Sequence, residues 1–351
     1  MTDFKAEDNT GTIPVQDKHK FDEAALHRFL LENVEGYSGD LLVEEFAGGQ
    51  SNPTYLLTSG ANRYVLRKKP AGMLLKSAHA VDREYKVLTA LNNADVPTAR
   101  TWAMCEDESV IGTMFYIMEY LDGRVIWDLS TGPYSATERS ELWDAANVAM
   151  AKLHQVDYKA VGLQDFGKET DYIQRQYTRW AGQYEYTKTV DNPYMDNLIE
   201  YFPKHFPKND DCAIVHGDFK MDNLMMHRER GEVIGILDWE LSTLGNPLSD
   251  FAYLCRPYRD AWRNADLKKL GLPSEEEYVE AYCKRTGRDG IEDWDYYLAF
   301  NMFRLAAILQ GIAKRVLDGT AASQRAQQAG EGAYNMAKLA WAQIDKSVRL
   351  D

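Results

Sequence analysis

The segment best suited to chemistry runs from Ile214 to Leu224 and contains the triplet His216-Gly217-Asp218. Asp218 is followed five positions later by Asn223, and short apolar runs flank the segment, so we expect both side chains on one loop between two strands. A carboxylate in such a loop can accept the proton of a hydroxyl group and orient its oxygen, and an amide oxygen is a ligand that magnesium accepts. Lys220, two residues beyond Asp218, contacts a phosphate or is a solvated loop lysine, and the sequence leaves both alternatives open.

A second acidic position, Asp238, follows this loop. The apolar run Val233–Leu237 ends in Asp238, and together with Leu224–Met226 it predicts a β-hairpin that turns through residues 228–231. Such a hairpin brings Asn223 and Asp238 to the same end. Two hard oxygen ligands then converge, as magnesium requires.

The spacing from His216 through Asp218 to Asn223 matches the catalytic loop of kinases. In phosphoryl transfer, charge spreads over the γ-phosphoryl oxygens, so metal ions and positioning do most of the catalysis, and Asp218 would activate the acceptor hydroxyl. The plain alternative is a turn in which the aspartate caps and the glycine adopts a positive φ, but the combination with Asn223 and Asp238 argues against it. We expect His216 to hold the loop by hydrogen bonding and packing.

A phosphate anchor is expected on the third predicted strand, which ends at Arg67. Kinases place a lysine on this strand, where it pairs with the α- and β-phosphates and with a glutamate on the following helix. Arg67 stands in register and Glu84 is its expected partner, because a planar, permanently charged guanidinium can bridge phosphate and carboxylate. Lys68 is the rival anchor, and a surface ion pair is the alternative without function.

Two further segments are expected to contact a nucleotide. The run Gly48-Gly49-Gln50-Ser51-Asn52 lies where a turn would cover the phosphates, and its glycines allow backbone amides to approach closely, although it is not G-x-G-x-x-G. The run Glu119-Tyr120-Leu121 leads into a polar connector, and we expect its backbone to hydrogen-bond the adenine.

Hydrophobic periodicity predicts an α+β fold of two lobes. We expect a flexible leader at 1–20, an N-terminal nucleotide-binding lobe at 21–121 with a five-stranded antiparallel sheet, and a larger helical C-terminal lobe at 122–351 with the catalytic loop and the acceptor site. The predicted strands of the first lobe are Leu41–Phe46, Thr54–Thr58, Arg63–Arg67, Thr101–Cys105 and Met114–Glu119, and the predicted helices are Phe21–Val34, His79–Leu91 and two that start at caps Ser135 and Ser274.

Composition limits the partners. The 351 residues carry a formal net charge of -14, which argues against a sequence-independent nucleic-acid binder, because such a protein needs a basic face. The polar N-terminus predicts no secretory signal, and no stretch approaches the roughly 18 apolar residues of a membrane span. We therefore expect a cytoplasmic protein without nucleic-acid or membrane partners, as a monomer or homodimer. The four cysteines are widely spaced and predict buried, reduced thiols.

Together these motifs resemble those of the aminoglycoside-phosphotransferase and choline-kinase-like family, whose fold is the bilobal protein-kinase-like fold. The resemblance rests on His216-Gly217-Asp218 and Leu237-Asp238-Trp239-Glu240 and extends from about Val43 to the C-terminus. It implies that Asp250 supports the catalytic loop, that ATP and Mg²⁺ are the cofactors, and that the substrate is a hydroxylated small molecule.

Within this family, three segments look most similar to the phosphotransferase domain fused to acyl-CoA dehydrogenases: Tyr64–Arg67, Leu74–His79 and Asp238–Gly245. That resemblance implies a hydroxylated acyl-CoA acceptor. A protein kinase is disfavoured, because the short distance from Asp238 to Asp250 leaves no room for a long activation segment. The contrasting hypothesis is a pseudokinase or nucleotide-binding interaction module. Only the anchor lysine is replaced, by Arg67, so activity is favoured.

Overall fold

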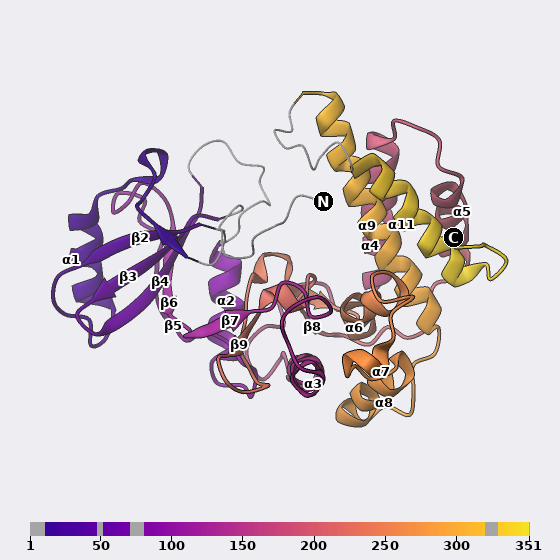
Figure 1. Ribbon diagram of the computed structural model, residues 1–351. Coiled ribbons are helices and arrows are strands. Elements are labelled where there is room, and N and C mark those ends of the chain that lie inside the picture. Colours follow the sequence, from indigo (N-terminus) through magenta and orange to yellow (C-terminus); the bar gives the residue numbers. More distant parts are fainter. Residues whose placement is uncertain (1–10, 48–51, 71–80, 320–328, 351) are drawn as a thin grey trace. The chain divides into compact units, whose positions relative to one another are not determined.

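The computed structural model describes residues 11–47, 52–70, 81–319 and 329–350, which fold into two compact units (Figure 1). The first unit comprises Met1–Gly132, Lys159–Leu163 and Met221–Ser242, and the second comprises Pro133–Tyr158, Gln164–Lys220 and Thr243–Asp351. The first unit therefore extends beyond the boundary predicted after Leu121. It includes the hairpin that follows the catalytic loop, because one strand of that hairpin pairs with the strand after the connector.

A six-stranded antiparallel sheet forms the frame of the first unit, in the order β1-β2-β3-β4-β6-β5. The strands are β1 (Thr12–Ile13), β2 (Leu42–Phe46), β3 (Thr54–Ser59), β4 (Asn62–Lys68), β5 (Thr101–Cys105) and β6 (Phe115–Glu119). Five of them were predicted. The sixth, β1, pairs with the end of β2 and lies in the segment predicted to be a flexible leader. Its described part is tied to the sheet, because Gln16 and His19 both bond to the Glu45 carboxylate, at 2.9 and 2.7 Å.

Two helices pack with this sheet. Helix α1 (Glu23–Asn33) begins where the Asp22 carboxylate accepts a hydrogen bond from the Ala25 N–H at 2.9 Å, and it buries Leu26 and Leu30 in the core of the unit. Helix α2 (Val81–Leu91) packs against β5 and β6. It buries Glu84 among its apolar positions, so a carboxylate is turned away from solvent.

A three-stranded sheet completes the first unit. Its strands are β7 (Gly123–Val125), β9 (Leu224–His227) and β10 (Val233–Ile236), with β9 in the middle. Glycine is required at Gly123, where a Cβ would lie 2.5 Å from the Met226 carbonyl oxygen, and at Gly235 a Cβ would displace the end of the Leu121 side chain, 2.2 Å away. These glycines let the connector approach the hairpin.

The second unit is helical. Its helices are α3 (Ala136–His154), α4 (Tyr172–Thr187), α5 (Pro193–Tyr201), α6 (Pro247–Cys255), α7 (Leu267–Leu270), α8 (Glu275–Thr286), α9 (Trp294–Leu317) and α11 (Ala329–Ile344). Helix α9 packs along α4 and α11 (Figure 1). Both predicted N-caps are present: the Ser135 hydroxyl accepts from the Glu138 N–H, and Ser274 forms a reciprocal capping box with Glu277. A two-stranded ladder joins β8 (Ala213–Val215) to β11 (Thr243–Gly245).

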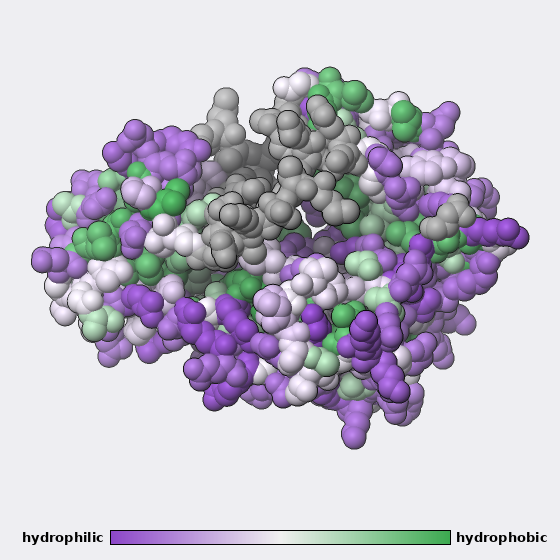
Figure 2. Space-filling view, viewed as in Figure 1, coloured by the Kyte–Doolittle hydropathy of each residue, from purple (hydrophilic) through white to green (hydrophobic). Residues whose placement is uncertain are grey.

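The face seen in Figure 2 carries mostly hydrophilic side chains, with scattered apolar ones between them. In the described part of the chain no helix is both long and apolar enough to cross a membrane. All four cysteines are free; Cys105, Cys255 and Cys283 are buried and Cys212 is half-buried.

Candidate active site

The predicted hairpin brings Asn223 next to the segment that ends in Asp238. Leu224 on β9 pairs with Ile236 on β10, and the Leu237 N–H donates to the Asn223 carbonyl oxygen at 2.8 Å. The hairpin prediction is therefore confirmed. Residues 223 and 238 lie at its same end.

Asp238 has an unusual backbone conformation, with φ 64° and ψ 63°, just before a 3-10 helix over Trp239–Leu241. Aspartate is one of the few residues that tolerate this left-handed region, and such conformations are concentrated at functional sites. The carboxylate of Asp238 accepts a hydrogen bond from Arg67 Nη2 at 2.7 Å. Its side chain is 34% exposed.

Arg67 lies on β4 between Thr54 of β3 and Tyr116 of β6. Its Nε lies 2.9 Å from Glu84 Oε2, as an ion pair rather than an aligned hydrogen bond. The Glu84 carboxylate also accepts from Tyr116 Oη and from Asn52 Nδ2, each at 3.0 Å. Since the Glu84 side chain is only 2% exposed, this contact is not a surface ion pair.

The electrostatics of this cluster keep Arg67 charged. Burial opposes the charge of the guanidinium, but Glu84, Tyr116 and Asp238 outweigh it and raise the pKa of Arg67 above its ordinary value. Burial also raises the pKa of Glu84. The nearby Asp238 carboxylate adds to this rise, whereas Arg67 and Tyr116 oppose it. The result is a fixed cation held between two carboxylates, one buried and one partly exposed.

Lys68, the rival anchor, points to the opposite face of β4, as alternate residues of a strand do. Its Nζ donates to the His19 carbonyl oxygen at 3.1 Å and lies 5.0 and 5.4 Å from the ring centroids of Phe21 and Tyr55. Burial lowers the pKa of Lys68, and Glu45 opposes this effect. Arg67, and not Lys68, therefore shares a face with Glu84.

The catalytic loop leaves β8 in the second unit and is held by Asp250 of α6. The carboxylate of Asp250 accepts hydrogen bonds from the His216 N–H at 2.7 Å and from the Gly217 N–H at 3.0 Å. Gly217 has φ +82°, a conformation that favours glycine. His216 is fully buried, and its Nδ1 accepts from the Asp218 N–H at 3.3 Å. These contacts fix the backbone on both sides of residue 217.

A histidine that the sequence did not reveal supports Asp250. His154 Nε2, at the end of α3, lies 3.5 Å from Asp250 Oδ2, and its Nδ1 is 2.7 Å from the Tyr282 hydroxyl. Burial would raise the pKa of Asp250, but His154, His216 and the backbone donors outweigh it, so its pKa lies below the ordinary value. Asp250 is thus a buried carboxylate that stays ionised.

Asp218 and Lys220, the two residues predicted to act on the substrate, lie close together on the loop. Their closest atoms, Asp218 Oδ2 and Lys220 Nζ, lie 3.6 Å apart, and the side chains are 23% and 40% exposed. Behind the loop, Arg304 of α9 donates from Nη2 to the Gly217 carbonyl oxygen. Arg304 was also missed, because it is 87 residues away in sequence.

The remaining predicted contacts concern the nucleotide. Gly48, Gly49, Gln50 and Ser51 lie outside the described residues, whereas Asn52 is buried and binds Glu84. In the connector, the Glu119 N–H donates to the Arg100 carbonyl at 2.8 Å, and the Leu121 carbonyl accepts from the Gly123 N–H at 3.1 Å. Those two groups are used within the unit, so adenine contacts would fall to the other backbone groups of residues 119–121.

The donor set around Asp238 suits magnesium only together with a phosphate ligand. Among the described residues, no group of three or more His, Cys, Asp or Glu side chains could hold a metal ion. Asn223 and Asp238 supply two oxygen donors, and magnesium commonly completes its shell with phosphate oxygens and water. The residues present therefore fit a nucleotide-bound magnesium ion.

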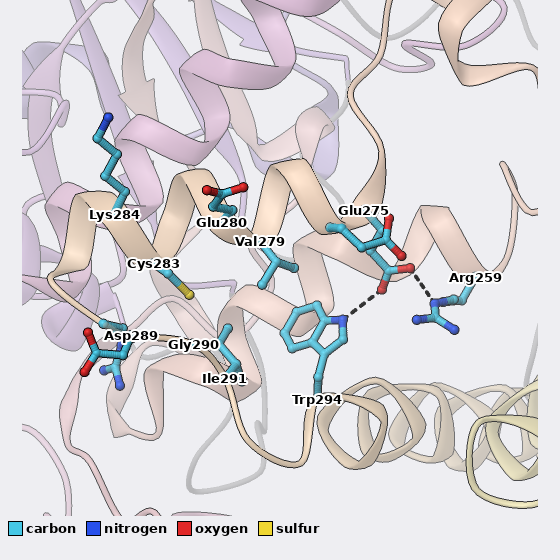
Figure 3. Close-up of a pocket in the computed structure, with 12 residues that line it drawn as sticks. Arg259, Glu275, Val279, Glu280, Cys283, Lys284, Asp289, Gly290, Ile291 and Trp294 are labelled. Carbon is cyan, nitrogen blue, oxygen red and sulfur yellow. Dashed lines mark hydrogen bonds and ion pairs between the residues drawn. The ribbon is translucent and has the colours of Figure 1, made fainter.

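A pocket of about 570 Å³ lies in the second unit between α8 and the loop that leads into α9 (Figure 3). Glu275 accepts hydrogen bonds there from Trp294 Nε1 at 2.8 Å and from Arg259 Nε at 2.5 Å. None of the predicted site residues lines this pocket. It has no part in the chemistry considered above.

The sequence is similar to those of known proteins over the range that contains these residues. The model of the phosphotransferase enzyme family, APH, matches residues 42–300. The chain belongs to this family. The matched range includes Arg67, the catalytic loop, the hairpin and Asp250, so the family extends over both units.

Individual relatives agree with this assignment to the phosphotransferase family. Mouse acyl-CoA dehydrogenase family member 10 is 43% identical over 339 residues, which are 94% of this chain and 32% of that protein. A crystal structure from Ralstonia eutropha, provisionally assigned as an aminoglycoside phosphotransferase, is 46% identical with a TM-score of 0.87 and covers 94% of this chain and 100% of its own. A choline kinase from Cryptosporidium parvum has a TM-score of 0.64 at 12% identity, covers 93% and 98%, and shows the fold alone. The predicted family and fold are confirmed.

Proposed function

We propose that the chain is an ATP-dependent small-molecule kinase that transfers the γ-phosphate to a hydroxyl group. The observation that carries the proposal is the buried Arg67, held between Glu84 and Asp238 at the end of the hairpin that bears Asn223. A permanently charged guanidinium fixed beside two oxygen donors is what a phosphate chain with its magnesium ion requires. Membership of the phosphotransferase family supports the same reaction.

Each residue has a distinct role in this proposal. Asp218 accepts the proton of the acceptor hydroxyl and orients the attacking oxygen, and Lys220 balances the charge of the transferred group. Arg67 binds the α- and β-phosphates while Glu84 holds its guanidinium in place. Asn223 and Asp238 hold magnesium, which neutralises the developing phosphate charge when it is bound. His216, Asp250 and His154 keep the loop of Asp218 in position.

The acceptor that we propose is a hydroxylated acyl-CoA. Support comes from the relatives named for acyl-CoA, such as the mouse protein, although the chain spans only 32% of that protein. The loop of Asp218 leaves from a helical unit, and helices of such a unit supply the acceptor site in the bilobal arrangement. Aminoglycosides, choline-like amines and sugars are the competing acceptors within the phosphotransferase family.

A panel of these four acceptor classes, incubated with Mg-ATP and followed by mass spectrometry of the products, tests the proposal. We expect a phosphorylated hydroxyacyl-CoA, and no product with Asp218→Asn. Binding of Mg-ATP by calorimetry without product from any acceptor class would favour the alternative, a pseudokinase or interaction module.

A further inference from the structure

Arg304 of α9 joins the catalytic loop to an aromatic surface. Its guanidinium donates to the carbonyl oxygen of Gly217, the residue before Asp218, and its Cζ lies 5.2 Å from the ring centroid of Tyr253 and 5.8 Å from that of Trp180. Within the described residues, no carboxylate is bonded to Arg304. A half-buried guanidinium with only a carbonyl and two rings as partners keeps donors for a further anion.

Two arginines of α4 lie on the same surface. Arg179 Cζ is 4.9 Å from the ring centroid of Trp180, on which Arg304 also lies, and Arg175 stands one helical turn earlier. Arg175 donates to the Lys168 carbonyl at 3.0 Å, and neither arginine has a carboxylate partner in the described part of the chain. The three arginines act on one buried hydroxyl: burial raises the pKa of Tyr172 to about 12, Asp250 adds to this rise, and the charges of Arg304, Arg175 and Arg179 oppose it.

This arrangement is unusual for the composition of the chain, which has 54 acidic and 40 basic residues. Many arginines of the described residues form ion pairs with carboxylates, as Arg256 does with Asp260 beside the same Tyr253. Burial raises the pKa of Tyr253 to about 12; Asp218 adds to this effect, and Arg304, Arg256 and Lys220 oppose it. Asp218 and Arg304 therefore act on the same side chain, so the Arg304 guanidinium lies near the end of the loop that bears Asp218.

We propose that Arg304, Arg179 and Trp180 form an anion-recognition surface beside the Asp218 loop, which selects acceptors that carry a carboxylate or phosphate group and rejects cationic ones. The proposal rests on the kinase function proposed above and names the charge of its acceptor. An arginine fork recognises carboxylate and phosphate in a bidentate manner, whereas an amine would be repelled by the same guanidinium. Arg304 is a specificity-determining residue, since the anion would be set relative to Asp218 through the Gly217 contact.

The test compares acceptors that differ in charge. The probes are hydroxybutyryl-CoA, with its phosphates; hydroxybutyrate, with its carboxylate; neutral hydroxybutyramide; and choline, a cation. The variants are Arg304→Gln and Arg179→Gln, with Arg28→Gln on α1 as a control that removes the same charge from an exposed position. In Arg304→Gln we expect kcat/KM for the better anionic probe to fall about 10- to 100-fold more than kcat/KM for hydroxybutyramide, whose own loss reports the broken contact with Gly217. Arg179 is exposed, so Arg179→Gln removes a charge with little effect on folding. It should lower kcat/KM for the anionic probe several-fold.

The two anionic probes show whether a phosphate or a carboxylate is recognised. The probe whose turnover falls more in the variants carries the recognised group. Equal losses for anionic and neutral probes would overturn the proposal and leave Arg304 as a positioning residue of the loop. If the unaltered protein phosphorylates none of the probes, the kinase proposal fails, and calorimetric binding of CoA decides the surface separately. Binding that is weakened in Arg304→Gln and Arg179→Gln but not in Arg28→Gln supports anion recognition, and unchanged binding overturns it.

Discussion

Replacing Arg67 with alanine tests the central ion pair of the site. Among the described residues, the change leaves the Glu84 carboxylate, 2% exposed, with the Tyr116 hydroxyl and the Asn52 amide as its donors. Removing one partner of a buried pair costs about 3–5 kcal/mol, and the two remaining hydrogen bonds place this loss near the lower end, at about 3 kcal/mol of unfolding free energy. Asp238 adds less to the loss, because it is one-third exposed.

The loss should depend on pH in a defined direction. Burial raises the pKa of Glu84 and Arg67 opposes the rise, so removal of Arg67 raises this pKa further. A carboxyl group whose pKa is higher in the folded than in the unfolded state stabilises the fold below its unfolded pKa, and this contribution is lost as pH rises through the folded pKa. The stability difference between the two proteins should therefore shrink as pH falls from about 8 to about 5.

Urea unfolding of a double-mutant cycle measures both effects. Glu84→Gln keeps the hydrogen-bonding side chain and removes the charge, so in the Arg67→Ala background it should restore part of the loss, with a coupling of roughly 0.5–3 kcal/mol. Arg63→Ala on the same strand is the control: this arginine is 43% exposed and faces Asp122 at 3.6 Å, so about 1 kcal/mol or less is expected. Additivity of Arg67→Ala and Glu84→Gln within roughly 0.5 kcal/mol would refute the reasoning.

Three further predictions concern neighbouring positions. Asp238→Ala should abolish Mg-dependent ATP binding in calorimetry, and Asn223→Ala should weaken it more mildly; unchanged Mg-ATP affinity in Asp238→Ala would contradict the assigned metal site. Lys68→Met should change the unfolding free energy by about 1 kcal/mol and leave ATP affinity intact, because the lysine faces away from Glu84; a large loss of ATP affinity would return the anchor to Lys68. Asp250→Asn should cost about 2–4 kcal/mol at neutral pH, since a carboxylate that accepts two backbone N–H groups is lost. The pKa of Asp250 is depressed, so its contribution is present above the unfolded value and is lost as pH falls through the folded one; an Asp250→Asn penalty that persists in acid below that point would count against this account.

Local signals in the sequence were sufficient for much of this structure. Alternation of apolar residues located five of the six strands of the large sheet, and Ser135 and Ser274 marked helix starts because their hydroxyls bond to nearby backbone. The hairpin after Asn223 was predictable for the same reason, since turn and strands are contiguous. Kinase-like spacing also placed Arg67 with Glu84, and the distance between them agrees with the prediction.

Other features depend on contacts between distant segments and left no local trace. Strand β1 has two residues, too few for a period, and it is held by its pairing with β2 and by the hydrogen bond that Thr12 Oγ1 donates to the Glu44 carboxylate at 2.9 Å. His154 contacts Asp250, which holds the catalytic loop, from 96 residues away in the sequence. Arg304 contacts Gly217 of the loop itself from 87 residues away. To choose between Arg67 and Lys68, one must know on which face of β4 Glu84 of α2 lies, because adjacent residues of a strand point to opposite faces.

The most direct test of the account is turnover by the unaltered protein and by Asp218→Asn at matched Mg-ATP saturation. The account predicts transfer of the γ-phosphate of ATP to a hydroxylated acceptor by the unaltered protein, and ATP affinity that is nearly unchanged in Asp218→Asn. General base catalysis typically contributes about 10²- to 10⁴-fold to the rate, so turnover by that variant should fall at least about 100-fold. Near-normal transfer by Asp218→Asn would contradict the central claim.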